Sequence, residues 1–291
     1  MQLFPKKLSQ IYLVLFVSAF LTITGNFTFF QKTLLVYPLS ENWLFLGSLF
    51  FFLFTFLAAL LLLFCYRVTT KPILMVLLMI SAIVSYSTNN YGIVFDHNMI
   101  LNTFETDTSE FLDLVSFKSI LYFFIFGLLP SIFVLKVKLI KISFKAQLWE
   151  RIKTFLVLVI IFVIIVLTFS KHYSSFAREN RDLRLYITPT YYLYSATKFV
   201  DSKFATSTKP FKEIGLDAKL NKKTDTRRLV ILVVGETARA DHMSLNGYDR
   251  NTNPYLEKEE IISFKQMTSC GTDTALSVPC MFSLLDRSGY N

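Results

Sequence analysis

The stretch WLFLGSLFFFLFTFLAALLLLFCY, residues 43–66, contains no charged side chain. A helix needs about 20 apolar residues to cross the hydrocarbon core of a bilayer, so this stretch predicts a membrane span. Four further apolar runs lie at Ile11 to Phe30, Pro72 to Ser87, Ser119 to Leu135 and Phe155 to Ser170. The sequence therefore predicts a multi-pass α-helical membrane domain of five transmembrane helices over residues 1–170.

The first, second and fifth runs are strong, although the first has a competing interpretation, and the third and fourth are weaker. The first follows Lys6 and Lys7, as a secretory signal peptide would, but no small-residue cleavage site comes after it and four more spans do. We therefore expect a retained membrane anchor. The run from Pro72 is short and ends in the polar SYSTNN. The fourth run contains Gly127 and Pro130, which membrane helices tolerate where neighbours satisfy the freed backbone groups.

The positions of lysine and arginine set the expected orientation, because cytoplasmic loops keep these residues. With the N-terminus inside, the basic residues that face the cytoplasm are Lys6, Lys7, Arg67, Lys71, Lys136, Lys138, Lys141, Lys145, Arg151 and Lys153. The loop between the third and fourth runs is acidic, and everything after residue 170 lies on the far side of the membrane. The net charge of +9 then reflects topology. No basic stripe with interleaved aromatics predicts binding to nucleic acid.

Two cysteines fall in the exported part of the chain, where disulfides persist. A bridge between Cys270 and Cys280 would stabilise the loop by about 3 kcal/mol in the chain-entropy description. The alternative, two free thiols in a cytosolic domain, requires the opposite topology. Cys65 lies inside the second run and is expected to be a buried, small apolar residue.

Residues 171–225 are too polar to cross a membrane, yet their aromatic side chains lie among arginines and lysines. This mixture is typical of helices at a lipid headgroup surface. We expect interfacial bridging helices that break at Thr188-Pro189, because the residue before a proline avoids the helical conformation. A plain linker is the alternative.

A soluble domain is expected over residues 226–291. Leu229 to Val234 is a continuous aliphatic run, which is the pattern of a strand buried in a parallel sheet, and Gly235 and Glu236 follow it. Ligands of open α/β sheets bind beyond the carboxyl ends of the strands, so Glu236 is a candidate functional acid. Alternatively, it is an acid in the first turn of a helix, where it complements the helix dipole.

The stretch SCGTDTALSVPCMFS, residues 269–283, gathers hydroxyl and carboxyl groups where a loop enters a helix. These groups belong to Thr272, Asp273, Thr274 and Ser277. Free backbone N–H groups at a helix start can bind phosphate, and a divalent cation would stabilise a threonine alkoxide there. From these residues alone, a cluster that merely caps the helix is the favoured interpretation.

The motifs VVGETARADHMSLNGYDRNTNPYL (233–256) and SCGTDTALSVPCMFS follow one another behind five predicted spans. The combination resembles the phosphoethanolamine transferases that modify lipid A and core sugars, a family that includes the mobile colistin-resistance enzymes. The loop NNYGIVFDHNMILNTFETDTSEFLDL (89–114) resembles the family's loop between its third and fourth spans. The resemblance implies a protein of the bacterial inner membrane with a cytoplasmic N-terminus, followed by the N-terminal portion of a periplasmic α/β domain of the alkaline-phosphatase type.

The resemblance also implies roles for individual residues. The family's zinc-binding glutamate falls on Glu236, its zinc-bound nucleophilic threonine on Thr274, and its disulfide on Cys270 and Cys280. The family's contacts to the donor lipid fall on Asn102, Thr106 and Glu110. The spacing of these three would put them on one face of a helix. A solvated acidic connection is the alternative for this loop.

The reaction that the resemblance implies has two steps. Thr274, activated on Zn²⁺, attacks the phosphorus of phosphatidylethanolamine and releases diacylglycerol, and lipid A or an inner-core sugar of lipopolysaccharide then displaces the threonine-linked phosphoethanolamine. Zinc would stabilise the alkoxide and offset phosphoryl charge. Glu110 would pair with the ethanolamine ammonium. Polymyxin resistance would follow from the lost negative charge.

The chain departs from the family's pattern after LLDRSGYN, because the family's remaining zinc ligands, an aspartate and a histidine, lie beyond it. We therefore expect this polypeptide alone to have little activity. Two other functions remain open. One is a related headgroup transferase of the glycerol-phosphate type, against which the paired cysteines and the outer loop count. The other is a non-catalytic remnant or regulatory membrane protein.

Overall fold

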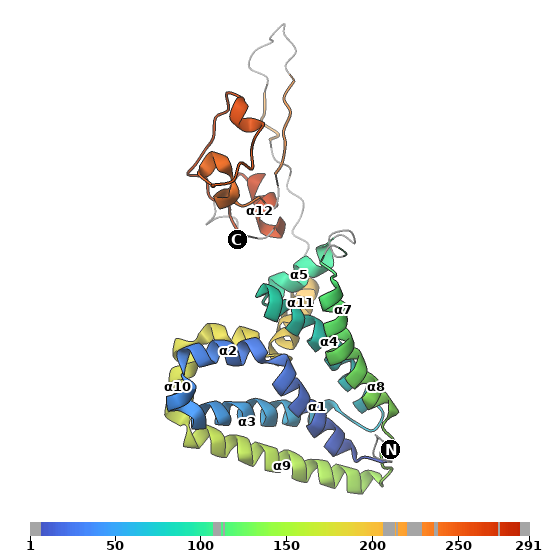
Figure 1. Cartoon of the computed structure of the whole chain (residues 1–291). Coiled ribbons are helices and arrows are strands. Elements are labelled where there is room, and N and C mark those ends of the chain that lie inside the picture. Colours follow the sequence, from blue (N-terminus) through green and yellow to red (C-terminus); the bar gives the residue numbers. More distant parts are fainter. Residues whose placement is uncertain are drawn as a thin grey trace. The chain divides into compact units, whose positions relative to one another are not determined.

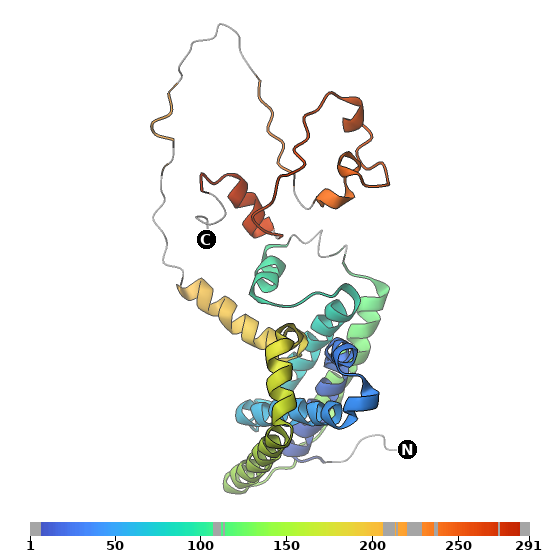
Figure 2. The same cartoon turned by 90° about the vertical axis from the view of Figure 1, so that its left-hand side faces the viewer.

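The structure, a computed structural model, describes residues 7–106, 112, 114–205, 213, 215–219, 229–235, 238–272 and 274–285 of the 291-residue chain. The chain divides into two compact units, Met1–Ser207 and Thr208–Asn291. The described elements of both units are helices (Figures 1 and 2), and those of the first unit are much the longer.

Within the described residues, four helices are long and apolar enough to cross a membrane. They are α3 (Leu39–Phe64), α4 (Thr70–Tyr91), the continuous segment Phe117–Lys136 and α9 (Phe144–Thr168). A fifth candidate is the pair α1 (Gln10–Gly25) and α2 (Phe27–Val36), which is bent by 58°. The third predicted run does not stop at its polar end. It continues to Tyr91, and Gly92 in the left-handed conformation then ends the helix.

The bend between α1 and α2 lies at Asn26, whose backbone leaves the helical conformation. The side-chain amide of Asn26 donates to the carbonyl of Thr188 at 2.8 Å, and its oxygen accepts from the Thr188 N–H at 3.0 Å. The amide also lies within hydrogen-bonding distance of two carbonyls in the last turn of α1. Because a kink needs its own hydrogen bonds when it is buried, Asn26 both permits and fixes the bend. The first predicted span is therefore broken rather than straight.

The core of the first unit lies among α1, α3 and α4. It contains buried side chains such as Leu13, Val17, Leu57, Leu61, Leu74 and Leu78. Many large apolar side chains on the outer faces stay exposed, including Phe51 at 54% and Ile160 at 56%. Apolar patches of this extent are unusual on water-soluble monomers and normal on surfaces that face lipid. The first unit is thus a helical domain of the membrane type.

The segment Phe117–Lys136 consists of α7 (Phe117–Phe123), a single π-helical turn at Phe124–Leu128, and α8 (Leu129–Lys136). A methyl group at Gly127 would lie 3.1 Å from the Cβ of Ala82 on α4 and 3.3 Å from the ring of Phe123. The absence of a side chain at Gly127 therefore lets this segment approach α4 closely.

Three helical pieces follow α9: α10 (Ser170–Glu179), the 3₁₀ helix η2 (Arg181–Tyr186) and α11 (Thr190–Ala205). An aromatic cluster attaches α10 to the spans, since the Phe176 ring lies 6.3 Å from Phe29 and 5.8 Å from Phe45. The chain interrupts its helices between η2 and α11, where Thr188-Pro189 was expected to break them. Hydrogen bonds join this region to the spans, from Thr188 to Asn26 and between Tyr192 of α11 and Ser81 of α4.

The second unit lacks strands in its described part. Leu229 to Val234, predicted to be a buried strand, has no regular secondary structure, and its side chains are 44–86% exposed. A strand is stable only when its backbone groups pair with a neighbour, and the described residues of this unit offer no partner strand. The prediction of a buried strand is therefore wrong for this structure. The unit contains short 3₁₀ turns and the helix α12 (Thr274–Met281).

Candidate active site

The outer loop of the first unit forms the short helix α5 (His97–Glu105). It begins where the Asp96 carboxylate accepts from the N–H of Met99 at 2.8 Å, which satisfies one of the free donors of the first turn. It ends at Glu105, since the backbone of Thr106 is extended. The Thr106 hydroxyl donates to the carbonyl of Asn102 at 2.7 Å.

The expected single helical face over Asn102, Thr106 and Glu110 is therefore only partly present. Asn102 lies on α5 and is half-buried, and Thr106 lies one residue beyond the helix end. Glu110 lies outside the described residues. Asn102 and Thr106 remain close, since the carbonyl of one accepts from the hydroxyl and the N–H of the other.

Helix α5 packs against α11. His97 Nε2 lies 2.9 Å from the Ser202 hydroxyl, and the Phe104 ring stacks on Phe199 with 5.2 Å between centroids and 2° between planes. The two helices lie side by side in the upper part of the first unit (Figure 1). The helix that bears Asn102 is thus held by the segment that follows the last span.

Charged side chains lie around Tyr191 of α11. Burial raises the pKa of the Tyr191 hydroxyl, and the Asp96 carboxylate raises it further. The hydrogen bond to Ser195 and the cations Arg184 and Lys198 act in the opposite direction. Both cations therefore lie within electrostatic range of Tyr191, as does the carboxylate that caps α5.

In the second unit, a disulfide joins Cys270 and Cys280, with Cα atoms 6.3 Å apart. Cys280 belongs to α12, and Cys270 lies in the loop before it, so the bridge closes the loop onto the helix. Thr274 is the first residue of α12 and is exposed. A side chain at Gly271 would collide with Leu276, so this loop also packs closely against α12.

The residues described do not form a metal site on their own. Among them, no group of three or more histidine, cysteine, aspartate or glutamate side chains is arranged to hold a metal ion. Glu236, the zinc ligand that the resemblance implies, and Asp273 lie outside the described residues. The fit of the chain to zinc thus depends on Thr274 and on Glu236, which the structure does not describe.

Residues 53–204 match the family described as "Phosphoethanolamine transferase EptA/EptB", and residues 228–291 match the family described as "Sulfatase". The chain belongs to the phosphoethanolamine transferase family. The resemblance stated from the motifs is confirmed.

Individual members of the transferase family match along nearly the whole chain. The phosphatidylethanolamine transferase Mcr-1 of Escherichia coli is 39% identical over 294 residues, which cover 99% of this chain and 54% of that protein. The phosphoethanolamine transferase EptA of Salmonella typhimurium is 31% identical, over 98% of this chain and 53% of its own length. The chain spans about half the length of the curated relatives it matches.

A solved transferase structure has the same fold. It is the integral membrane protein lipooligosaccharide phosphoethanolamine transferase A from Neisseria meningitidis, with a TM-score of 0.87 and 31% identity. The likeness covers 99% of this chain and 54% of that one.

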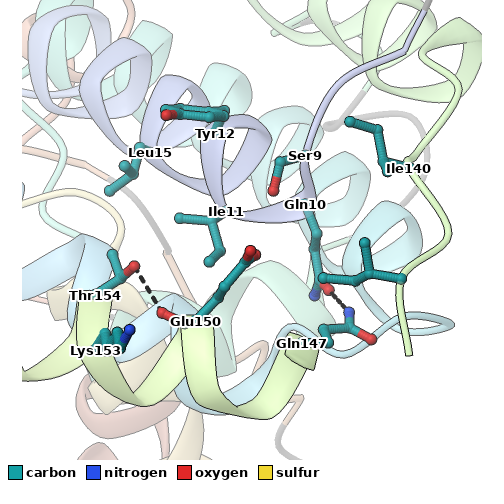
Figure 3. Close-up of a pocket in the computed structure, with 11 residues that line it drawn as sticks. Ser9, Gln10, Ile11, Tyr12, Leu15, Ile140, Gln147, Glu150, Lys153 and Thr154 are labelled. Carbon is teal, nitrogen blue, oxygen red and sulfur yellow. Dashed lines mark hydrogen bonds between the residues drawn. The ribbon is translucent and has the colours of Figure 1, made fainter. Parts of the chain in front are cut away.

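At the opposite end of the first unit from α5, a cavity of about 390 Å³ with both polar and apolar walls lies between α1 and α9 (Figures 1 and 3). Gln10 donates to the carbonyl of Cys65 at 2.8 Å and to the Thr70 hydroxyl at 2.6 Å, and Gln147 donates to Gln10. The amides of Gln10 and Gln147 bond to protein groups and so connect helix ends. The cavity lies far from α5 and therefore from the transferase's candidate donor-binding residues.

Several residues that organise the transferase's first unit were missed at the sequence level. Asn26 gave a signal, as an amide inside an apolar run. The pairs His97–Ser202 and Phe104–Phe199 gave none, since each joins residues about a hundred positions apart.

Proposed function

We propose that this chain supplies the membrane domain and nucleophile loop of an enzyme that transfers phosphoethanolamine from phosphatidylethanolamine to lipid A or to inner-core sugars of lipopolysaccharide. The observation that carries the proposal is Thr274 at the start of α12, inside a loop closed by the Cys270–Cys280 disulfide. The family match over the membrane unit supports it.

In the first step the Thr274 oxygen bonds to the donor phosphorus, the bond from phosphorus to diacylglycerol breaks, and the threonine proton ends on the released diacylglycerol. In the second step an acceptor oxygen replaces Thr274 on phosphorus, and the acceptor's proton returns to the threonine. The exposed Thr274 is accessible to both substrates. The N–H groups of the first turn of α12 favour an anionic phosphoryl group next to Thr274.

Zinc on Glu236 and Thr274 belongs to the proposal, and when bound it would lower the pKa of the threonine hydroxyl. Because the described residues hold no complete metal site, the two steps above are written for this chain's own groups.

The proposal includes five spans over residues 1–170, a bridging region over 171–225 and an α/β periplasmic domain that starts at 226. It places the N-terminus in the cytoplasm of a bacterial inner membrane. The lysines and arginines on one side of the predicted spans support this orientation. Asn102, Thr106 and Glu110 would bind the donor. Transfer would lower the negative charge of lipid A, and with it the attraction of cationic polymyxins.

A chimera tests the function. Residues 1–291 replace the matching part of Mcr-1, and lipid A and core from Escherichia coli that produces the chimera are analysed by mass spectrometry. We expect one added phosphoethanolamine, which Thr274→Ala abolishes and Thr272→Ala, a nearby exposed control, retains. The position of the addition identifies the acceptor.

Other outcomes would contradict the proposal. An added glycerol phosphate would favour the related headgroup transferases. A properly inserted chimera that leaves lipid A and core unmodified would favour a non-catalytic membrane protein.

A further inference from the structure

An apolar groove of about 700 Å³ lies between α3 and α4 and is closed on one side by α11. Its walls include Phe56 and Leu61 of α3, Ile73 and Val76 of α4, and Leu193 and Tyr194 of α11. Both α3 and α4 are long and apolar enough to span a membrane. The groove is therefore a recess in a surface that lipid contacts.

One face of α11 lines the groove. It consists of residues spaced three or four apart, which lie on the same side of a helix: Thr190, Leu193, Tyr194 and Thr197. On another side, the buried Tyr192 hydroxyl lies 3.2 Å from the hydroxyl of Ser81 on α4. This contact fixes α11 against α4, so the groove has a defined wall.

Two cations lie near the groove: Lys198 follows Thr197, the last residue of α11 that lines it, and Arg184 lies on η2. Lys198 Nζ lies 4.9 Å from the centre of the Tyr194 ring, which itself lines the groove. Arg184 lies in electrostatic range of both Tyr191 and Lys198. In the described part of the chain neither cation takes part in an ion pair, although the Asp96 carboxylate is also in range of Tyr191. An apolar recess that leads to exposed cations matches a phospholipid, which joins hydrocarbon to an anionic phosphate.

The same helix also carries α5, through Phe104 on Phe199 and His97 on Ser202. A lipid in the groove would thus have its headgroup beside α11, the helix that positions α5 and with it Asn102. This relation distinguishes the groove from other apolar surfaces of the unit, such as the exposed face of α9 around Ile160.

We propose that the groove between α3 and α4 holds an acyl chain of the phosphatidylethanolamine donor, with the lipid phosphate beside Lys198. One face of α11 then contacts the donor's hydrocarbon while another face positions α5. This assignment rests on the proposed function, because it takes the occupant to be the donor. It adds a hydrocarbon subsite to the headgroup residues.

Photolabelling of the purified 291-residue protein tests the assignment. The protein is reconstituted in phosphatidylcholine bilayers with a trace of phosphatidylethanolamine that carries a diazirine at the end of one acyl chain. We expect peptides from 56–64 and 72–77 to be labelled several-fold more than peptides from α9. Excess unlabelled phosphatidylethanolamine should remove the groove labelling, and excess phosphatidylglycerol should not.

A matched pair of variants tests the groove itself. Val76→Trp fills it and should lower the labelling several-fold, whereas Ile83→Trp, on the same helix, equally exposed and outside the groove, should not. Lys198→Met should weaken the competition by unlabelled phosphatidylethanolamine. Equal labelling of α9, or no response to Val76→Trp, would overturn the groove. Equal competition by phosphatidylglycerol would overturn the donor as its occupant.

These outcomes are separable from failure of the proposed function. Labelling requires no transfer, so the chimera with Thr274→Ala should label like the unchanged chimera. Specific labelling in a chimera that leaves lipid A unmodified would support the groove and contradict the transferase.

Discussion

His97 Nε2 lies 2.9 Å from the hydroxyl of Ser202, and this hydrogen bond joins the first residue of α5 to α11 across 105 residues of sequence. With the stacked rings of Phe104 and Phe199, it holds α5 at both of its ends. The position of Asn102 therefore depends on a helix that lies outside the spans.

Ser202→Ala, combined with Phe199→Ala, should release α5 from α11. Each side chain contributes on the order of 1 kcal/mol, as a single hydrogen bond or aromatic pair does, so the double variant should exchange amide hydrogens in 97–105 at least tenfold faster. Hydrogen-exchange mass spectrometry measures this. Asp201→Ala, on an exposed position of the same helix, is the control. Unchanged exchange in the double variant would show that α5 is held by other contacts.

Asn26→Ala should detach the segment around Thr188. The variant leaves the buried Thr188 N–H and carbonyl unpaired, which costs about 2–4 kcal/mol. Limited proteolysis should then cut between η2 and α11. Asn42→Ala removes an exposed amide with one bond, to the carbonyl of Pro38, and should leave the cleavage pattern unchanged. Resistance of the Asn26 variant to cleavage would contradict the role of this amide.

Burial raises the pKa of Tyr192 to about 12, against the opposing effect of its hydrogen bond with Ser81. An unfolded tyrosine ionises near pH 10. The neutral, buried hydroxyl therefore contributes stability below pH 10 that is lost as the pH rises to 12, on the order of 3 kcal/mol. The difference in phenolate absorbance between the unchanged protein and Tyr192→Phe should have its midpoint well above pH 10. A midpoint at pH 10 would show that α11 does not bury this side chain.

Gly127→Ala should destabilise the contact between the π-helical turn and α4, because the new methyl group would lie 3.1 Å from the Cβ of Ala82. Overpacking of this kind costs about 1–3 kcal/mol. Ala82→Gly removes the opposing methyl group and should restore much of the lost stability in the double variant. Thermal unfolding in detergent measures both effects, and a double variant no more stable than Gly127→Ala would contradict the close approach.

The membrane unit could be predicted from sequence because length and apolarity alone define a span. The bend in the first run could not, because Asn26 replaces helical hydrogen bonds with bonds to Thr188, a partner 162 residues away. The π-helical turn at Phe124–Leu128, which lies close to α4 at Gly127, was not predicted either.

The sequence motifs identified residues of the candidate site but not the local structure around all of them. SCGTDTALSVPCMFS marked Thr274 and the two cysteines, which the structure joins in a disulfide at α12. The prediction of a strand at Leu229 to Val234 was wrong because aliphatic residues favour a strand but do not supply the neighbouring strands with which it must pair. The predicted helical face through Asn102 and Thr106 is shortened because the backbone turns extended at Thr106, which helical spacing alone did not indicate.

The pair of hydrogen bonds between Asn26 and Thr188 can form only late in the synthesis of the protein. A ribosome synthesises Asn26 long before Thr188, so the oxygen of that amide has no Thr188 N–H to accept from while the intervening spans insert. The backbone of Thr188 can reach the bend between α1 and α2 only after the last span has been synthesised. Formation of the hydrogen bonds between Asn26 and Thr188 would therefore indicate that all spans of the membrane domain are in place.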